Sequence, residues 1–303
     1  MGTARASGEG EREELEGYFG PRSMAWRIGR ERMLVVGGGR AVLMQLAHPL
    51  VAAGVGDHSA YARDPWARTF ATLDLMLRIT FGTRSEARAA SRTINRLHTH
   101  VTGTLAEDAG AYTAGTPYRA RQPDLLLWVY ATLIDTGLYL HPLLVGPLTE
   151  DEREAYYQES KRTVVLLGLP EAMLPPRLAD LQVYMDEMLA SAELALTAEA
   201  REVARVILHM PVPFVLRPAL ALGSEATVGW LPNRLRALYG LSWDDRRQKL
   251  LEAAERGVRA VLPAVPPALR YNVWAQRAYR RVRASYDAEE RGQNEAGDTS
   301  RTA

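Results

Sequence analysis

Histidines are the residues of this 303-residue chain best suited to metal or acid–base chemistry, and two of the six lie close together. His98 and His100 fall in a segment of helical spacing, and residues two apart on a helix point about 200° apart. Only one of them can therefore face a given pocket. His98 shares its face with the apolar residues Ile94 and Val101, whereas His100 lies on the more polar side. We expect His98 to point inward, as a ligand or as a core histidine with its hydrogen bonds satisfied.

Arg68 and Thr72 form a second candidate pair. They are four residues apart on a helix that Asp64 and Pro65 are suited to open, as N-cap and first helical residue, so they should share a face. A cation and a hydroxyl on one partly apolar face can bind a carboxylate or polarise a bound oxygen. The alternative is an arginine that pairs with an acidic residue at a helix–helix contact.

The absence of cysteine excludes several kinds of chemistry. Disulfides, thiolate nucleophiles, zinc fingers, iron–sulfur clusters and a thiolate-ligated haem all require this residue. No histidine has an acidic residue three positions before it, as a di-iron bundle needs, or two positions after it, as a facial triad needs. The 37 basic residues are balanced by 36 acidic ones, which argues against a dedicated nucleic-acid-binding protein.

The spacing of apolar residues is helical along most of the chain, and no strand or hairpin signal interrupts it. We therefore predict a single all-α domain over residues 17–286, flanked by disordered polar tails at 1–16 and 287–303. The predicted helices are 22–36, 39–54, 65–81, 85–107, 123–140, 149–168, 176–191, 197–209, 231–239, 243–262 and 271–286.

Capping signals support three of these helix starts. Thr149 with Glu152, and more weakly Ser242 with Asp245, have the spacing of capping boxes, and Thr83-Arg84-Ser85-Glu86 offers another start. The proline-rich residues 211–218 are predicted to form a corner between helices, because proline disrupts a helix interior.

Membrane-spanning and secretory segments are not expected. The N-terminal residues are charged and contain no apolar signal region. The longest apolar stretches, 41–55 and 125–134, are shorter or more interrupted than the roughly 20 apolar residues that a spanning helix needs. We interpret both as buried helices and expect a cytoplasmic protein.

The candidate residues lie within an ordered series of motifs, collinear over about residues 18–281. Together these motifs resemble the MpaB-type and rubber-oxygenase (latex-clearing protein) catalytic-domain family. The series includes Phe19-Gly20-Pro21, Gln45-Leu46-Ala47-His48-Pro49-Leu50, Asp64-Pro65-x-x-Arg68-x-x-x-Thr72, His98-x-x-Val101-x-Gly103, Leu126-Leu127-Trp128-Val129, Leu167-Gly168-Leu169-Pro170 and Tyr239-Gly240-Leu241-x-Trp243.

The resemblance implies an all-α, globin-like fold that encloses one b-type haem. By motif, His98 would be the axial ligand of the iron, and Arg68 and Thr72 would line the opposite side of the haem. The chain departs from the family pattern in three places: Ala71 stands where a lysine is common, Tyr130 where a histidine is common, and Gln122-Pro123 where Asp-Pro is common. We therefore expect a substrate other than polyisoprene. Tyr130 is a candidate catalytic residue, as a hydrogen-bond donor or as a phenolate ligand, or else an ordinary core tyrosine.

Three further residues are candidates for cofactor binding. His48 either points into the haem pocket or bonds to the backbone beside Pro49. Arg40 and Arg27 either pair with haem propionates, since guanidinium binds carboxylate in a bidentate manner, or form ordinary salt bridges.

The resemblance and the site residues together predict a haem b-dependent oxygenase or oxidase. Its substrate would be a hydrophobic small molecule, and its oxidant O₂ or peroxide, with the electron donor left open. The alternative is a non-catalytic haem-binding sensor or carrier on the same fold.

Overall fold

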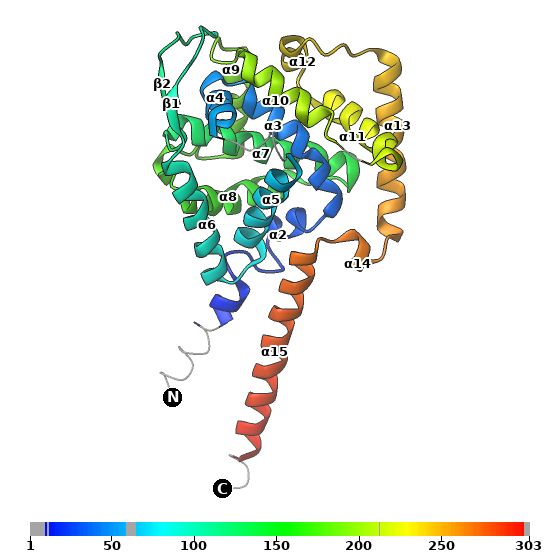
Figure 1. Cartoon of the computed structure of the whole chain (residues 1–303). Helices are drawn as coiled ribbons and strands as arrows, with labels where there is room; N and C mark the ends of the chain where they lie inside the picture. The colour runs from blue at the N-terminus through cyan, green and yellow to red at the C-terminus, as the bar shows by residue number, and fades with distance from the viewer. Residues whose placement is uncertain (1–9, 11, 59–64, 212, 300–303) are drawn as a thin grey trace.

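The structure is a computed structural model that describes residues 10, 12–58, 65–211 and 213–299. It is a bundle of helices with one small two-stranded sheet (Figure 1), which confirms the all-α prediction. The helices are α2 (Met24–Gly29), α3 (Gly38–Leu46), α4 (Pro49–His58), α5 (Pro65–Phe81), α6 (Arg84–Thr99), α7 (Pro123–Leu144), α8 (Glu150–Leu166), α9 (Leu178–Ala190), α10 (Ala198–Leu208), α11 (Arg217–Trp230), α12 (Asn233–Tyr239), α13 (Asp245–Val261), α14 (Pro267–Arg270) and α15 (Val273–Thr299). Short 3-10 helices are η1 (Arg32–Gly37), η3 (Glu171–Met173), η4 (Phe214–Leu216) and η5 (Leu262–Ala264).

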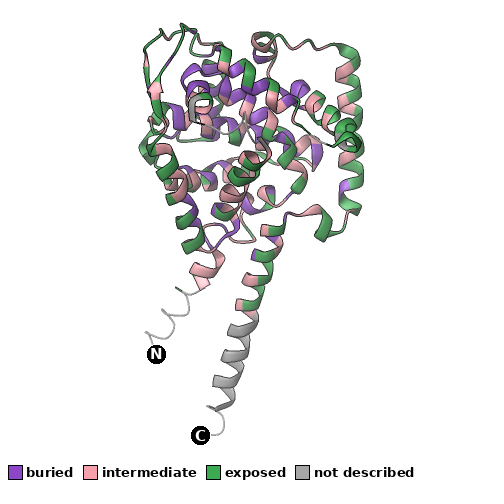
Figure 2. Cartoon of the chain, viewed as in Figure 1, coloured by how far each residue is buried: buried purple, intermediate pink, exposed green. Residues whose placement is uncertain are grey.

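Helix α7 forms the centre of the bundle. Its buried residues occur on all sides of the helix, and it packs against α3, α8 and α13. A helix that is apolar all round is stable only when neighbouring helices surround it. Figure 2 shows the buried residues concentrated in this part of the molecule, whereas α13 and the described part of α15 are largely exposed.

The apolar stretch 41–55 is divided into α3 and α4, and most of its residues are buried in the core. Among the described residues, no single helix is long and apolar enough to cross a membrane. The segments Arg32–Leu46 and Pro49–Gly56 reach that length and composition only when taken together, across a bend of 112°. The break falls at His48, because the following Pro49 has no N–H to continue the helical hydrogen bonds.

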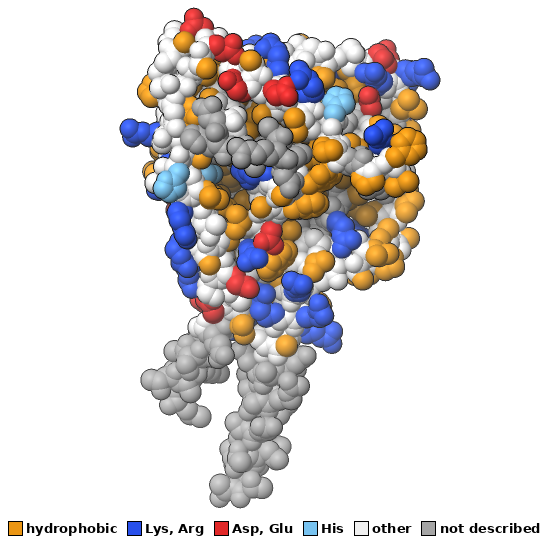
Figure 3. Space-filling view, viewed as in Figure 1, with side chains coloured by type: hydrophobic (Ala, Val, Ile, Leu, Met, Phe, Trp, Pro, Cys, Tyr) orange, Lys and Arg blue, Asp and Glu red, His pale blue; other side chains and the backbone are white. Residues whose placement is uncertain are grey.

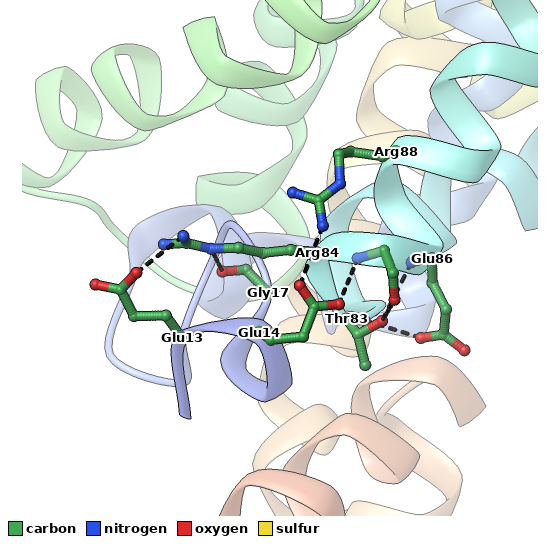
Figure 4. A network of polar contacts seen from close by, with 8 residues as sticks. Glu13, Glu14, Gly17, Thr83, Arg84, Glu86 and Arg88 are labelled. Atoms are coloured by element: carbon green, nitrogen blue, oxygen red, sulfur yellow. Dashed lines mark hydrogen bonds and ion pairs between the residues drawn. The ribbon is translucent and has the colours of Figure 1, made fainter. Parts of the chain in front are cut away.

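Helices α5 and α6 pack side by side, and the start of α6 is fixed by several polar contacts (Figure 4). The helix starts where Thr83-Arg84-Ser85-Glu86 predicts, and Thr83 and Glu86 form a capping box there. Glu13 pairs with Arg84 at 2.9 Å, and the carboxylate of Glu14 accepts a hydrogen bond of 2.7 Å from the backbone N–H of Ser85. The other end of α6 carries His98, so these contacts anchor the helix that positions the main candidate residue.

The structure ends α6 at Thr99, earlier than the predicted residue 107. Strand β1 (Thr102–Thr104) follows and pairs antiparallel with β2 (Pro117–Arg119). Gly103 of β1 lies close to Tyr118 of β2, so an added Cβ at Gly103 would lie 2.6 Å from the Tyr118 hydroxyl. The two strands can approach this closely because residue 103 has no side chain. Residues 101–104 also favour a strand, since β-branched residues and glycine are weak helix formers.

Two other elements differ from the sequence prediction. Helix α11 was not predicted, because the prolines at 211–218 indicate a corner; the helix begins at Arg217 with Pro218 in its first turn, where proline is tolerated. Helix α15 continues to Thr299, so residues 287–299 are helical where the composition predicts a disordered tail. The capping box of Thr149 with Glu152 at the start of α8 is confirmed, whereas the N-cap of α13 is Asp244 and not the predicted Ser242, because the Asp244 side chain accepts from the backbone N–H of Arg247.

Candidate functional site

His98 lies in the last turn of α6 and is half-buried, whereas His100 is exposed. The predicted difference between the two faces is therefore confirmed. The Nδ1 atom of His98 is buried and has no hydrogen-bond partner among the described residues. Because a buried polar atom without a partner is uncommon in a folded protein, this nitrogen is a candidate contact for a bound ligand.

Three causes lower the pKa of the His98 imidazole below its ordinary value. Burial contributes most, followed by the positive charges of Arg68 and Arg121. Each cause disfavours the imidazolium form. The ring is therefore neutral at physiological pH, which is the state that binds a metal ion.

Arg68 and Thr72 interact directly on α5, as their spacing predicts. The Arg68 guanidinium donates a hydrogen bond to Thr72 Oγ1, and the Thr72 hydroxyl donates to the Arg68 carbonyl at 3.0 Å. Because α5 packs against α6, this pair lies on the helix beside His98, close enough for Arg68 to influence the His98 pKa. Ala71, at the position of the common lysine, is exposed on the same helix.

Other buried polar atoms near α6 and α7 also lack partners among the described residues: Asn95 Oδ1, Trp128 Nε1 and the Tyr130 hydroxyl. Asn95 and His98 are three residues apart on α6 and share a face. Asn95 Nδ2 donates to the carbonyl of Leu166 on α8 at 3.0 Å. The Tyr130 ring also lies next to α8, 6.5 Å from the ring of Tyr157.

Tyr130 is a neutral phenol in this environment. Burial is the largest of the causes that raise the pKa of its hydroxyl above the ordinary value, and the neighbouring Tyr157 and Tyr156 add to it. This favours a hydrogen-bond donor over the phenolate alternative. Trp128 shares its face of α7 with Thr132, and Gln45 of α3 donates a hydrogen bond of 3.1 Å to the Thr132 hydroxyl. The Trp128 indole therefore lies on the α3 side of α7, whereas Tyr130 lies next to α8.

His48 lies at the break between α3 and α4 and is almost fully buried. Its Nε2 is 3.2 Å from the Tyr112 hydroxyl, and that hydroxyl donates to Glu193 at 3.1 Å. A phenol has one proton, so Tyr112 accepts the hydrogen bond from His48 Nε2–H. The Nδ1 atom then has a free lone pair, and it has no partner among the described residues. Burial lowers the pKa of His48 to about 4, despite an opposing effect of Asp124.

Arg40 and Arg27 form the ordinary salt bridges that were the alternative to propionate binding. The Arg40 guanidinium donates to the Trp230 carbonyl at 2.8 Å, to Thr136 Oγ1 at 2.6 Å and to Asp135 at 2.6 Å, so each of its nitrogens has a partner. Arg27 is paired with Glu152. Arg40 therefore has no guanidinium nitrogen left for a cofactor carboxylate, which corrects that part of the sequence prediction, and Arg27 has the salt bridge that was its alternative.

Four residues of this region have no role in the sequence prediction: Arg121, Tyr112, Asn95 and Trp128. Arg121 could have been found only from the fold, since nothing in its local sequence places it beside α6. Two surface hollows, of about 320 and 260 Å³, are lined by residues of α7–α9 and α11–α13 and do not include His98. Within the described ranges, no group of three histidine or acidic side chains is arranged to hold a bare metal ion.

Residues 26–262 match the family described as "ER-bound oxygenase mpaB/B'/Rubber oxygenase, catalytic domain". The chain belongs to this family. The family match covers most of the chain and includes α5, α6 and α7, so His98, Arg68, Thr72 and Tyr130 all lie within the catalytic domain.

Relatives of the chain are found in mycobacteria. The uncharacterized protein Rv2237 of Mycobacterium tuberculosis is 30% identical over 217 residues, which is 70% of this chain and 82% of that protein. The uncharacterized protein Mb2261 of Mycobacterium bovis matches to the same extent. No solved structure is significantly similar to the chain.

Proposed function

We propose that this member of the mpaB/rubber oxygenase family is a haem b-dependent oxygenase for a hydrophobic small molecule, with His98 as the axial ligand of the iron. The observation that carries the proposal is the buried, unpartnered Nδ1 of His98, on an imidazole that burial and two arginines keep neutral. A neutral histidine is the usual axial ligand in haem proteins that leave the sixth coordination site open.

The residues around His98 fit a haem. Haem propionates need cations, and Arg121 is a cation close enough to influence the imidazole. Asn95, one turn before His98 on α6, adds a polar atom without a partner among the described residues. When bound, haem supplies the redox chemistry with O₂ or peroxide that no side chain of this chain can perform.

The protein's own groups orient and polarise the reactants. The Thr72 hydroxyl accepts a hydrogen bond from the Arg68 guanidinium and so holds it in place on α5, where the guanidinium can donate to an oxygen that gains negative charge. The neutral phenol of Tyr130 is a further donor. The apolar residues of α7 supply walls that exclude water and favour an apolar substrate.

The first test is an absorption spectrum of the purified full-length protein in the oxidised, reduced and CO-bound states, with a pyridine haemochrome assay. We expect a Soret band at near-stoichiometric haem, lost or strongly shifted in His98→Ala. His100→Ala is the matched control, because His100 is two residues further along, exposed and on the other face; its spectrum should equal that of the unmodified protein.

Three outcomes contradict the proposal. No Soret band after haem is supplied during expression removes the haem assignment. A Soret band that is indifferent to His98→Ala moves the ligand elsewhere, with His48 as the next buried histidine to test. Stoichiometric haem with no O₂ consumption across a panel of apolar substrates supports the sensor or carrier function instead.

A further inference from the structure

Residues 213–223 form the most exposed apolar part of the described chain. Phe214, Val215 and Leu222 are 78%, 79% and 73% exposed, more than any other large hydrophobic side chain described. Single exposed apolar residues are ordinary on protein surfaces, but three in one short segment form a patch that indicates an interaction.

The exposure extends over most of the circumference of the first turns of α11. Its exposed apolar residues there are Pro218, Ala219, Ala221, Leu222 and Gly223, and fully buried side chains begin only at Thr227. The remaining side carries Leu220 and Ser224, which are partly buried, and Ser224 Oγ donates a hydrogen bond of 2.6 Å to the Leu208 carbonyl. The exposed apolar surface is therefore wider than one helix face, as suits insertion into a lipid surface.

The charge of the segment is complementary to an anionic surface. No aspartate or glutamate occurs between Glu202 and Glu225. Arg205 is paired with Glu202, whereas the Arg217 guanidinium lies 5.6 Å from the ring centre of Phe214, so a cation flanks the exposed aromatic tip. An exposed apolar tip with a cation beside it and no acidic residue in the segment suits the headgroup region of an anionic bilayer.

The patch is connected to the candidate site. The Trp66 indole on α5 donates a hydrogen bond of 2.7 Å to the carbonyl of Pro211 and stacks on Phe70, which is also exposed. Arg68 and Thr72 lie on the same turns of α5. In the space-filling view of Figure 3, hydrophobic side chains gather on the side of the molecule where Figure 1 places α11 and α13.

We propose that residues 213–223 are a membrane-docking segment that inserts into the headgroup region of an anionic phospholipid bilayer. Docking by this segment brings α5, which carries Arg68 and Thr72, next to the lipid. An apolar substrate could then enter from the bilayer; only this last consequence rests on the proposed function.

The test is co-flotation of the full-length protein with phosphatidylcholine vesicles that contain phosphatidylglycerol. We expect binding that falls at least about tenfold in the double variant Phe214→Asp, Val215→Asp, because both apolar side chains are lost. Arg217→Gln should weaken binding about fivefold, and only to the anionic vesicles. Val183→Asp is the matched control: Val183 on α9 is also exposed but lies among acidic residues, so its variant should bind normally.

A second readout does not depend on a destabilising change. The chain has no cysteine, so Val215→Cys and Val183→Cys each give one labelling site. An environment-sensitive dye at position 215 should shift to the blue when vesicles are added, and the dye at position 183 should not.

Three results overturn the proposal: no flotation of the unmodified protein, equal flotation of the double variant, or equal dye responses at both positions. A concentration-dependent dimer that the double variant dissociates, without vesicle binding, assigns the patch to a second copy of the chain. Haem content is measured on the same samples, so failure of docking and failure of haem binding are seen separately.

Discussion

Two regions of the molecule bury polar groups in different ways. At the junction of α3, α7 and α11, every nitrogen of the Arg40 guanidinium has a hydrogen-bond partner. Near the end of α6, the buried Nδ1 of His98 and Oδ1 of Asn95 have no partner among the described residues. Both regions bury polar groups, at a cost that hydrogen bonds must offset. In the first region the protein supplies those bonds itself. In the second, a bound molecule that supplies them would gain affinity.

The two regions thus separate residues that stabilise the fold from residues that are available for binding. Conversion of a satisfied group to an apolar one should destabilise the protein, because its partners lose their hydrogen bonds. The same change to an unsatisfied group should cost little stability and should affect binding instead. Substitutions in each region can test this difference, and the largest effect is expected at Arg40.

Arg40→Leu should lower the free energy of unfolding by about 3 kcal/mol, because it leaves the buried Trp230 carbonyl and the Thr136 hydroxyl without this partner. Urea unfolding monitored by circular dichroism measures the effect. Asp135→Asn is the control: the Asp135 side chain is 35% exposed, so water can replace part of what it loses, and the cost should be about 1 kcal/mol. Equal and small effects of both variants would contradict the assignment of Arg40 to the fold.

His48 combines features of the two regions. Its Nε2 is hydrogen-bonded to Tyr112, and its Nδ1 has no partner among the described residues. Its folded-state pKa of about 4 is below the unfolded value of 6.5, so the unfolded chain binds the proton first as the pH falls. The stability that the neutral imidazole provides is complete above pH 6.5 and decreases towards pH 4, by about 1.4 kcal/mol per pH unit within this range.

Unfolding free energies measured at several pH values across that range should therefore decline less steeply in His48→Gln than in the unmodified protein. The pKa values of His98 and His141 are lowered by burial as well, so part of the decline should remain in the variant. An unchanged slope would mean that His48 is protonated in the folded protein.

Gly37→Ala tests whether the satisfied region is also tightly packed. An added Cβ would lie 2.3 Å from Leu140 Cδ1 and 2.9 Å from Thr136 Cγ2, and both side chains are buried. We expect a loss of about 2 kcal/mol from overpacking. The control is Gly38→Ala, where an added Cβ would meet no atom within 4 Å; thermal denaturation should show a clear decrease in Tm for the first variant only.

The two regions also differ in how far the sequence predicts them. The start of α6 at Thr83 and the inward direction of His98 depend on local spacing, which is why both could be predicted. The partners of Arg40 are about 100 or more residues away along the chain, so only the fold reveals that this arginine is committed to a salt bridge. For the same reason, the sequence does not predict that Arg121 lies close enough to His98 to lower its pKa.

Helix α11 was not predicted from the sequence, for a different reason. Its first turns are apolar on all sides and preceded by prolines, so the pattern shows neither an amphipathic face nor a clear start. Periodicity detects a helix that divides its residues between core and water. It cannot detect one whose apolar residues remain exposed.

His98→Leu is expected to have the smallest effect on stability and to distinguish the two regions most directly. In the protein without haem, the buried Nδ1 has no hydrogen bond to lose among the described residues, and leucine of similar size removes a buried polar atom. The free energy of unfolding should therefore stay within about 1 kcal/mol of the unmodified value, or rise, while the Soret band disappears. If His98→Leu instead destabilises the haem-free protein as much as Arg40→Leu does, His98 is a structural residue and the comparison between the two regions fails.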